Sequence, residues 1–147
     1  MHETPSPMNV KRLLLAIVAG FVFIFATDFL VHGVWLVPDY TASMPLWRPE
    51  GEMQAHMPFL ALGQFLCATT FVFLWAKGFA DRGGSKCALI YGAMMGLFSQ
   101  VNTLVTYAVM TLPGVLAVKW FVVGVLQAIG LGIVTFLVYK PAAPVAR

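Results

Sequence analysis

Four long runs of apolar residues make up most of this 147-residue chain, and they indicate that it folds within a membrane. A bilayer core about 30 Å thick needs roughly 20 apolar residues at about 1.5 Å per residue. The runs extend over residues 13–37, 57–76, 88–112 and 117–139. Since 60% of the residues are hydrophobic and only 10% are charged, the polar side chains are too few to cover a water-exposed surface. We predict an all-α integral membrane protein, a single domain over residues 1–147 folded as an antiparallel four-helix bundle.

Prolines and glycines mark where the predicted helices end. Pro38 has no amide hydrogen to donate and ends the first helix, whereas Pro58 suits the first turn of the second. The pair Gly83-Gly84 predicts the turn between the second and third helices. The connection over residues 38–56 is the long one, and we expect it to form an outer loop.

The distribution of positive charge predicts which way the helices cross the membrane. Lysine and arginine are retained on the cytoplasmic side. With both termini in the cytoplasm, only Arg48 and Lys119 of the nine lysines and arginines lie outside. The others lie inside, namely Lys11, Arg12, Lys77, Arg82, Lys86, Lys140 and Arg147. We therefore predict a multi-pass protein of the bacterial inner membrane with an N-in, C-in topology.

Each predicted helix contributes a polar side chain to a layer near the middle of the membrane. At about 1.5 Å per residue, Gln100 and Gln127 lie near the midplane. An acid and an imidazole, Asp28 and His32, lie further out and one helical turn apart, so both can point into one cleft. A buried carboxylate costs several kcal/mol unless it is paired, hydrogen-bonded or protonated. The candidate binding residues are Asp28, His32, Gln64, Gln100, Asn102 and Gln127.

Two functions fit this layer. The first is binding or translocation of a proton, an ion or a small solute at an outward-facing Asp28/His32 cleft. The alternative is a non-catalytic accessory or structural subunit of a larger membrane complex, in which the layer only joins helices through hydrogen bonds worth about 0.6 to 2 kcal/mol each. The presence of Asp28 favours binding or translocation, because an amide would join helices equally well without the cost of burying a charge. His32, one turn away, supports the same function, because an imidazole changes its charge near neutral pH. We predict no catalytic residue and no organic cofactor, since the sequence contains no nucleophile constellation and no phosphate loop.

A metal site is a further hypothesis. Glu52 and His56 repeat the acid-x-x-x-His spacing of Asp28 and His32. Carboxylates and imidazoles are ligands of zinc, so these four residues can in principle hold a divalent metal at the outer mouth. The alternative is that Glu52 and His56 form the solvated first turn that leads into the second helix.

Small residues at four-residue spacing predict close helix packing, which in a membrane depends on such residues and on interhelical hydrogen bonds. We interpret them mainly as packing residues of the bundle, with a homodimer face as the alternative. Gln100 and Asn102 lie about 200° apart around the third helix, so they cannot face the same neighbour. We therefore expect a homo-oligomer or a membrane partner subunit against the third helix. The small residues are Ala88, Gly92 and Gly96 in the third helix and Gly124, Ala128 and Gly132 in the fourth.

Two classes of protein are disfavoured. The net charge of +3 follows from the topology, and the chain has no basic stripe with interleaved aromatic residues, so we predict no nucleic-acid partner. Cys67 and Cys87 do not form a Cys-x-x-Cys motif, which disfavours a disulfide-exchanging membrane enzyme.

The segment Asp28-Phe-Leu-Val-His32-Gly33, together with Leu46-Trp47-Arg48-Pro49-Glu50, resembles a group of uncharacterised small bacterial four-helix membrane proteins. This resemblance covers most of the first half of the chain and implies no activity. In topology alone the chain is also similar to small multidrug-resistance transporters, which have four spans and an acid in the first helix. That family exchanges protons for cationic drugs, but its glutamate motif and the dimer signature of its last helix are absent here.

Overall fold

The computed structural model describes residues 8–81 and 84–141, and over these ranges every regular element is a helix. The fold is therefore all-α, as predicted. Four of the helical segments are long and apolar enough to cross a membrane, which is the pattern of a multi-pass membrane protein. The elements are α1 (Val10–Leu30), the π-helix η1 (Val31–Trp35), α2 (Val37–Ala42), the 3-10 helix η2 (Met44–Leu46), α3 (Glu50–Gly78), α4 (Ser85–Val109) and α5 (Gly114–Val138).

The first span runs without a break from Val10 to Trp35. Its start is capped by Asn9, whose side chain accepts a hydrogen bond from the backbone N–H of Arg12. Its last turn widens into η1, a form of helix that often marks functional sites. The span thus ends two residues before the predicted end at residue 37, and Pro38 lies in the first turn of the next helix, α2, where its missing N–H is not needed.

The predicted outer loop 38–56 is the main error in the expected boundaries. Most of it is helical, and α3 begins at Glu50 rather than at residue 57. Glu50 and Glu52 stabilise this earlier start because negative charge is favourable in the first turn of a helix. Pro58 consequently lies inside α3 and not at its start.

The third and fourth helices were predicted about three residues too late, since α4 covers Ser85–Val109 and α5 begins at Gly114. Of the predicted Gly83-Gly84 turn, only Gly84 belongs to the described residues, where it precedes α4. Arg82, Gly83 and Arg147, which entered the turn and the charge pattern, lie outside them.

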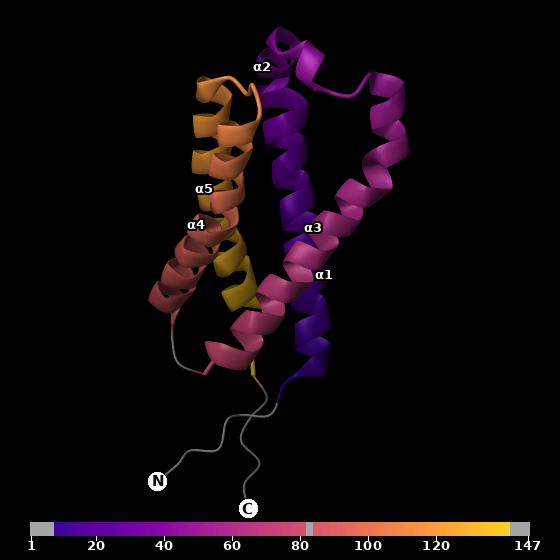
Figure 1. The fold of residues 1–147 in the computed structure, drawn as a ribbon. Coiled ribbons are helices and arrows are strands. Elements are labelled where there is room, and N and C mark those ends of the chain that lie inside the picture. The colour runs from indigo at the N-terminus through magenta and orange to yellow at the C-terminus, as the bar shows by residue number, and fades with distance from the viewer. Residues whose placement is uncertain (1–7, 82–83, 142–147) are drawn as a thin grey trace, which may run out of the picture.

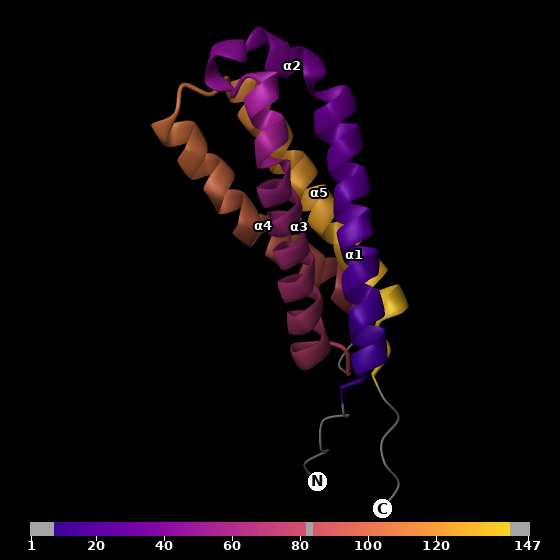
Figure 2. The same ribbon diagram turned by 90° about the vertical axis from the view of Figure 1, so that its right-hand side faces the viewer.

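The helices form a bundle from which α3 diverges at one end. α1 packs against both α3 and α5, and α4 packs against α5. The first turns of α1 lie at the same end as the last turns of α3 and α5 (Figures 1 and 2), and we call this half of the bundle the base. Towards the opposite half, the α2 end, α3 leans away from α1 (Figure 1), and every residue over 50–60 is exposed.

The base contains an aromatic core. Trp75 is 1% exposed and packs against Tyr91, with ring centroids 5.4 Å apart. The Tyr91 hydroxyl donates a 2.6 Å hydrogen bond to the backbone oxygen of Phe71, so α4 is tied to α3. Aromatic pairs in such geometry contribute about 0.5 to 1.5 kcal/mol beyond the burial of their surface.

Glycines bring the backbones of α4 and α5 into contact in the base. A Cβ atom added at Gly132 would lie 2.5 Å from the backbone oxygen of Ala88, and one at Gly92 would lie 2.6 Å from that of Ala128. Only residues without a side chain permit this approach. The predicted small-residue stripes therefore pack the chain's own helices together, as expected.

Candidate functional site

Asp28 occupies the last turn of α1, immediately before the π-helix. Its two carboxylate oxygens accept hydrogen bonds from different helices. The amide of Gln64 on α3 donates to Oδ2 at 2.6 Å, and the amide of Gln127 on α5 donates to Oδ1 at 2.7 Å. The carboxylate thus joins the last turn of α1 to the middle of α3 and of α5.

The two amides differ in how firmly they are held. Gln127 also donates at 2.7 Å to the hydroxyl of Thr27, which in turn donates to the backbone oxygen of Phe23. Gln64 is only 8% exposed, and its side-chain oxygen has no hydrogen-bond partner among the described residues. The Gln64 amide donates an N–H group to Asp28, while its oxygen is free. A rotation about the last bond of the side chain would exchange the two groups and present the oxygen to Asp28.

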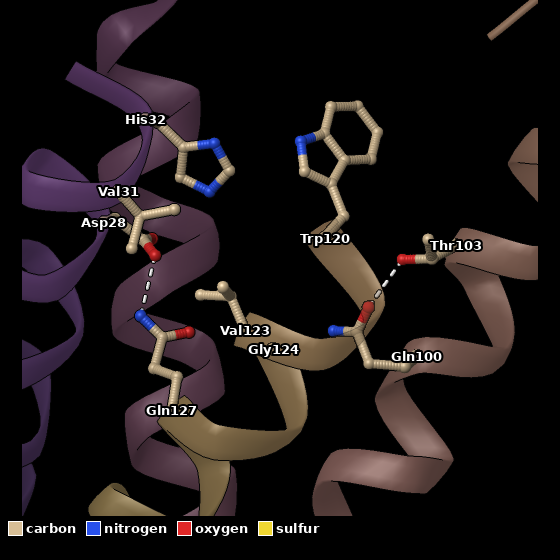
Figure 3. Close-up of a pocket in the computed structure, with 9 residues that line it drawn as sticks. All are labelled: Asp28, Val31, His32, Gln100, Thr103, Trp120, Val123, Gly124 and Gln127. Atoms are coloured by element: carbon tan, nitrogen blue, oxygen red, sulfur yellow. Dashed lines mark hydrogen bonds between the residues drawn. The ribbon is translucent and has the colours of Figure 1, made fainter. Parts of the chain in front are cut away.

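A cavity of about 180 Å³ lies between Asp28 and α4 (Figure 3). Asp28 and Gln127 form one side of it, and Gln100 lies across from them with its oxygen bonded at 2.6 Å to the Thr103 hydroxyl. Gly124 makes room for this arrangement, because a Cβ there would overlap the amide of Gln100. The lining residues are Asp28, Val31, His32, Gln100, Thr103, Trp120, Val123, Gly124 and Gln127.

Aromatic side chains line the cavity on the side of the α2 end. His32 and Trp120 face each other across it (Figure 3). The ring nitrogen Nδ1 of His32 shares a hydrogen bond with the hydroxyl of Tyr40 on α2, and Trp120 Nε1 donates to the same hydroxyl at 2.9 Å. Burial raises the pKa of Tyr40, so its hydroxyl keeps its proton at neutral pH. One tyrosine of α2 therefore links α1 to α5 above the cavity.

An ion pair lies beside this aromatic cover. Lys119 on α5 contacts both carboxylate oxygens of Asp39 on α2 at 2.8 Å. The ammonium also lies 5.3 Å from the centre of the Trp35 ring. Both contacts keep the positive charge of Lys119 away from the cavity, which it does not line.

The structure brings together most of the residues proposed from the sequence. Asp28, His32, Gln100 and Gln127 line the same cavity, and Gln64 bonds to Asp28 from outside the lining. Asn102 does not join them. It is exposed on the other side of α4, where its backbone oxygen accepts a hydrogen bond from Thr106.

Sequence reasoning missed Tyr40, Thr103, Trp120 and Gly124. Three of these could have been found from helical spacing. Trp120 and Gly124 precede Gln127 by seven and three positions, and Thr103 follows Gln100 by three. Positions three, four and seven apart share one helix face. No such signal exists for Tyr40, because its place depends on how α2 folds back.

Glu52 and His56 lie apart from Asp28 and His32. Both are exposed on the part of α3 that leans away, where His56 Nδ1 donates to the backbone oxygen of Glu52 at 2.8 Å and Arg48 lies 3.9 Å from the Glu52 carboxylate. Over residues 8–81 and 84–141, no group of three or more His, Cys, Asp or Glu side chains is placed to hold a metal ion. The structure therefore does not bring Asp28, His32, Glu52 and His56 together around one metal ion.

Comparisons of the chain with protein families, with characterised proteins and with solved structures found no match.

Proposed function

We propose that this is a bacterial inner-membrane protein that binds, and translocates, a proton, an ion or a small solute at the cavity beside Asp28. Both termini lie in the cytoplasm, and the α2 end faces outward. The excess of lysine and arginine at the base supports this orientation. The four apolar spans and the large apolar side chains on the exterior, such as Phe98 at 76% exposure, support the membrane location.

The observation that carries the proposal is the carboxylate of Asp28 at the wall of a cavity inside the spans. An acid placed in a membrane only to join helices needs no empty space next to it. Here one face of Asp28 is held by two amides, and the other borders room for a ligand. Acidic residues that line intramembrane cavities mark ion and proton pathways.

The amides around Asp28 suit a group that changes its charge. Ionised Asp28 accepts the N–H groups of Gln64 and Gln127. A protonated Asp28 needs an acceptor, and the free side-chain oxygen of Gln64 supplies one after the amide rotates. Both protonation states of Asp28 can thus be hydrogen-bonded without moving a helix.

The test compares the wild-type protein with Asp28→Asn in detergent. Melting temperatures are measured from pH 5 to 8 and with sodium, potassium, magnesium, zinc and ammonium chlorides. We expect a pH- or ion-dependent shift in the wild type that Asp28→Asn removes without loss of the fold, since asparagine keeps one acceptor and gains a donor. Asp81→Asn, at an exposed acid at the base, is the matched control and should keep the shift. Identical profiles for wild type and Asp28→Asn would exclude the proposal.

One observation favours the second candidate, an accessory subunit or a homo-oligomer. Asn102 is exposed on the side of α4 that faces away from the cavity, seven residues before the helix ends, where lipid offers no hydrogen-bond partner for its amide. A second copy of the chain or a partner subunit packed against α4 would supply a hydrogen-bond partner for the Asn102 amide. Cysteines placed at Thr106 should cross-link two chains in native membranes if the contact is a homodimer. Failure to cross-link, with a monomeric particle in mild detergent, would contradict this candidate.

A further inference from the structure

We propose that the ligand of the Asp28 cavity is a small organic ammonium ion of about the size of choline, with Asp28 as its counter-ion and the ring of Trp120 as an apolar and cation-attracting wall. This inference rests on the proposed function of the same cavity and names the class of its ligand.

The charge of the lining selects a cation. Asp28 is the single acid among the nine lining residues, none of them is a lysine or an arginine, and the one imidazole, His32, is already hydrogen-bonded to Tyr40. Lys119 is the basic residue near the cover, and both oxygens of Asp39 engage it. An anion next to Asp28 would meet a like charge in surroundings of low dielectric constant, where repulsion is strong. A cation there compensates the buried carboxylate.

The size of the cavity selects an organic cation over a bare metal ion. A volume of about 180 Å³ corresponds to roughly six water molecules at about 30 Å³ each, far more than one dehydrated metal ion occupies. Magnesium and calcium take about six or more oxygen ligands, so at this lining most of them would have to be water. Asp28 is the one charged oxygen donor in the lining, and the side-chain oxygen of Gln100 is already engaged by Thr103.

The apolar part of the wall selects a cation with methyl or methylene groups. Val31 and Val123 contribute only hydrocarbon, and Trp120 has committed its N–H to Tyr40. What Trp120 can still offer to the cavity is its ring system, and tryptophan is the side chain that attracts ammonium groups most strongly. The amide nitrogen of Gln100 faces the cavity (Figure 3), where it can donate to a hydroxyl group of the ligand.

The experiment uses choline and 3,3-dimethylbutan-1-ol, a neutral molecule of nearly the same shape in which carbon replaces the nitrogen. Binding to the purified full-length chain is measured by the shift of the melting temperature and by tryptophan fluorescence. We expect choline to bind the wild type at least about tenfold more tightly than the neutral alcohol, a difference of about 1.4 kcal/mol. Asp28→Asn should abolish the preference for the charged compound, and Asp81→Asn should keep it.

The contribution of the ring is tested separately. Trp120→Phe retains an aromatic wall but loses the N–H bond to Tyr40, whereas Trp120→Leu loses both. We expect choline affinity to fall further in Trp120→Leu than in Trp120→Phe. Equal affinities in these two variants would overturn the assignment of the ring as the cation-attracting wall.

The outcomes separate this inference from the proposal on which it rests. If protons or inorganic ions shift the melting temperature through Asp28 while choline binds no better than the neutral alcohol, the cavity is a proton or ion site and the inference is wrong. If no probe distinguishes the wild type from Asp28→Asn, both the inference and the proposed function fail.

Discussion

The base and the α2 end of the bundle are packed by different means. In the base, Gly92 and Gly132 let two backbones touch, and an aromatic core around Trp75 fills the remaining space. Towards the α2 end, α3 leans away, a smaller cluster of buried leucines packs the remaining helices, and the polar groups of Asp28 and Tyr40 link them around a cavity. The base is therefore packed through backbone contact and aromatic burial, whereas the α2 end combines a smaller apolar cluster with polar links around a cavity.

The largest expected effect is in the base. Gly132→Ala places a methyl group 2.5 Å from the backbone oxygen of Ala88, and a backbone atom cannot move aside as a side chain can. We expect a loss of about 3 kcal/mol, at the upper end of the usual cost of overpacking. Gly63→Ala on α3 is the matched control, because nothing lies within 4 Å of its new methyl group. Thermal unfolding in detergent measures both, and equal stabilities would show that α4 and α5 are not in backbone contact.

A smaller effect is expected at the cover of the cavity. Tyr40→Phe removes the hydroxyl that accepts the Trp120 N–H and bonds to His32. A part-buried donor left without a partner costs about 1 kcal/mol or somewhat more. The control is Tyr107→Phe, at an exposed tyrosine, for which we expect a change within about 0.5 kcal/mol. If Tyr40→Phe behaves like this control in thermal unfolding, the bond network does not hold α2 in place.

The smallest change in stability is expected for Gly124→Ala at the wall of the cavity. The added methyl group overlaps the end of the flexible Gln100 side chain, which can swing away, and alanine favours the helix by about 1 kcal/mol. The net change in stability should therefore be below about 1 kcal/mol. The displaced amide would narrow the cavity, so choline affinity should fall although the fold is kept. Unchanged affinity would indicate that ligands do not reach this wall.

The boundaries of some helices could be predicted from the sequence and those of others could not. Long apolar spans are recognisable because the thickness of a bilayer sets their length, and α4 and α5 were located within about three residues. The segment over 38–56 was misassigned because Pro58 was taken as the start of the second helix and because no helix was expected to begin near Pro38. Proline is also compatible with a first turn, as in α2, and with the interior of a long apolar helix, as in α3.

The candidate site was predictable only in part for a similar reason. Depth along a helix can be estimated from residue number, so Asp28, Gln64, Gln100 and Gln127 were correctly placed at similar levels. Which of them touch depends on the rotation of each helix about its axis. Asn102 shares their level but faces away from the cavity, because it is about 200° from Gln100 around α4.

The amino-acid sequence by itself determined the all-helical fold, the four spans and the level of the polar residues, because these follow from hydrophobic length and from a rise that is the same in every α-helix. Only the tertiary structure decided that two glutamines share Asp28, that Trp120 and His32 line one cavity with it, and that Tyr40 folds back to join them. These contacts join residues from about 8 to 99 positions apart, and they depend on how α3 leans and on how η1 and α2 turn, which no local pattern encodes.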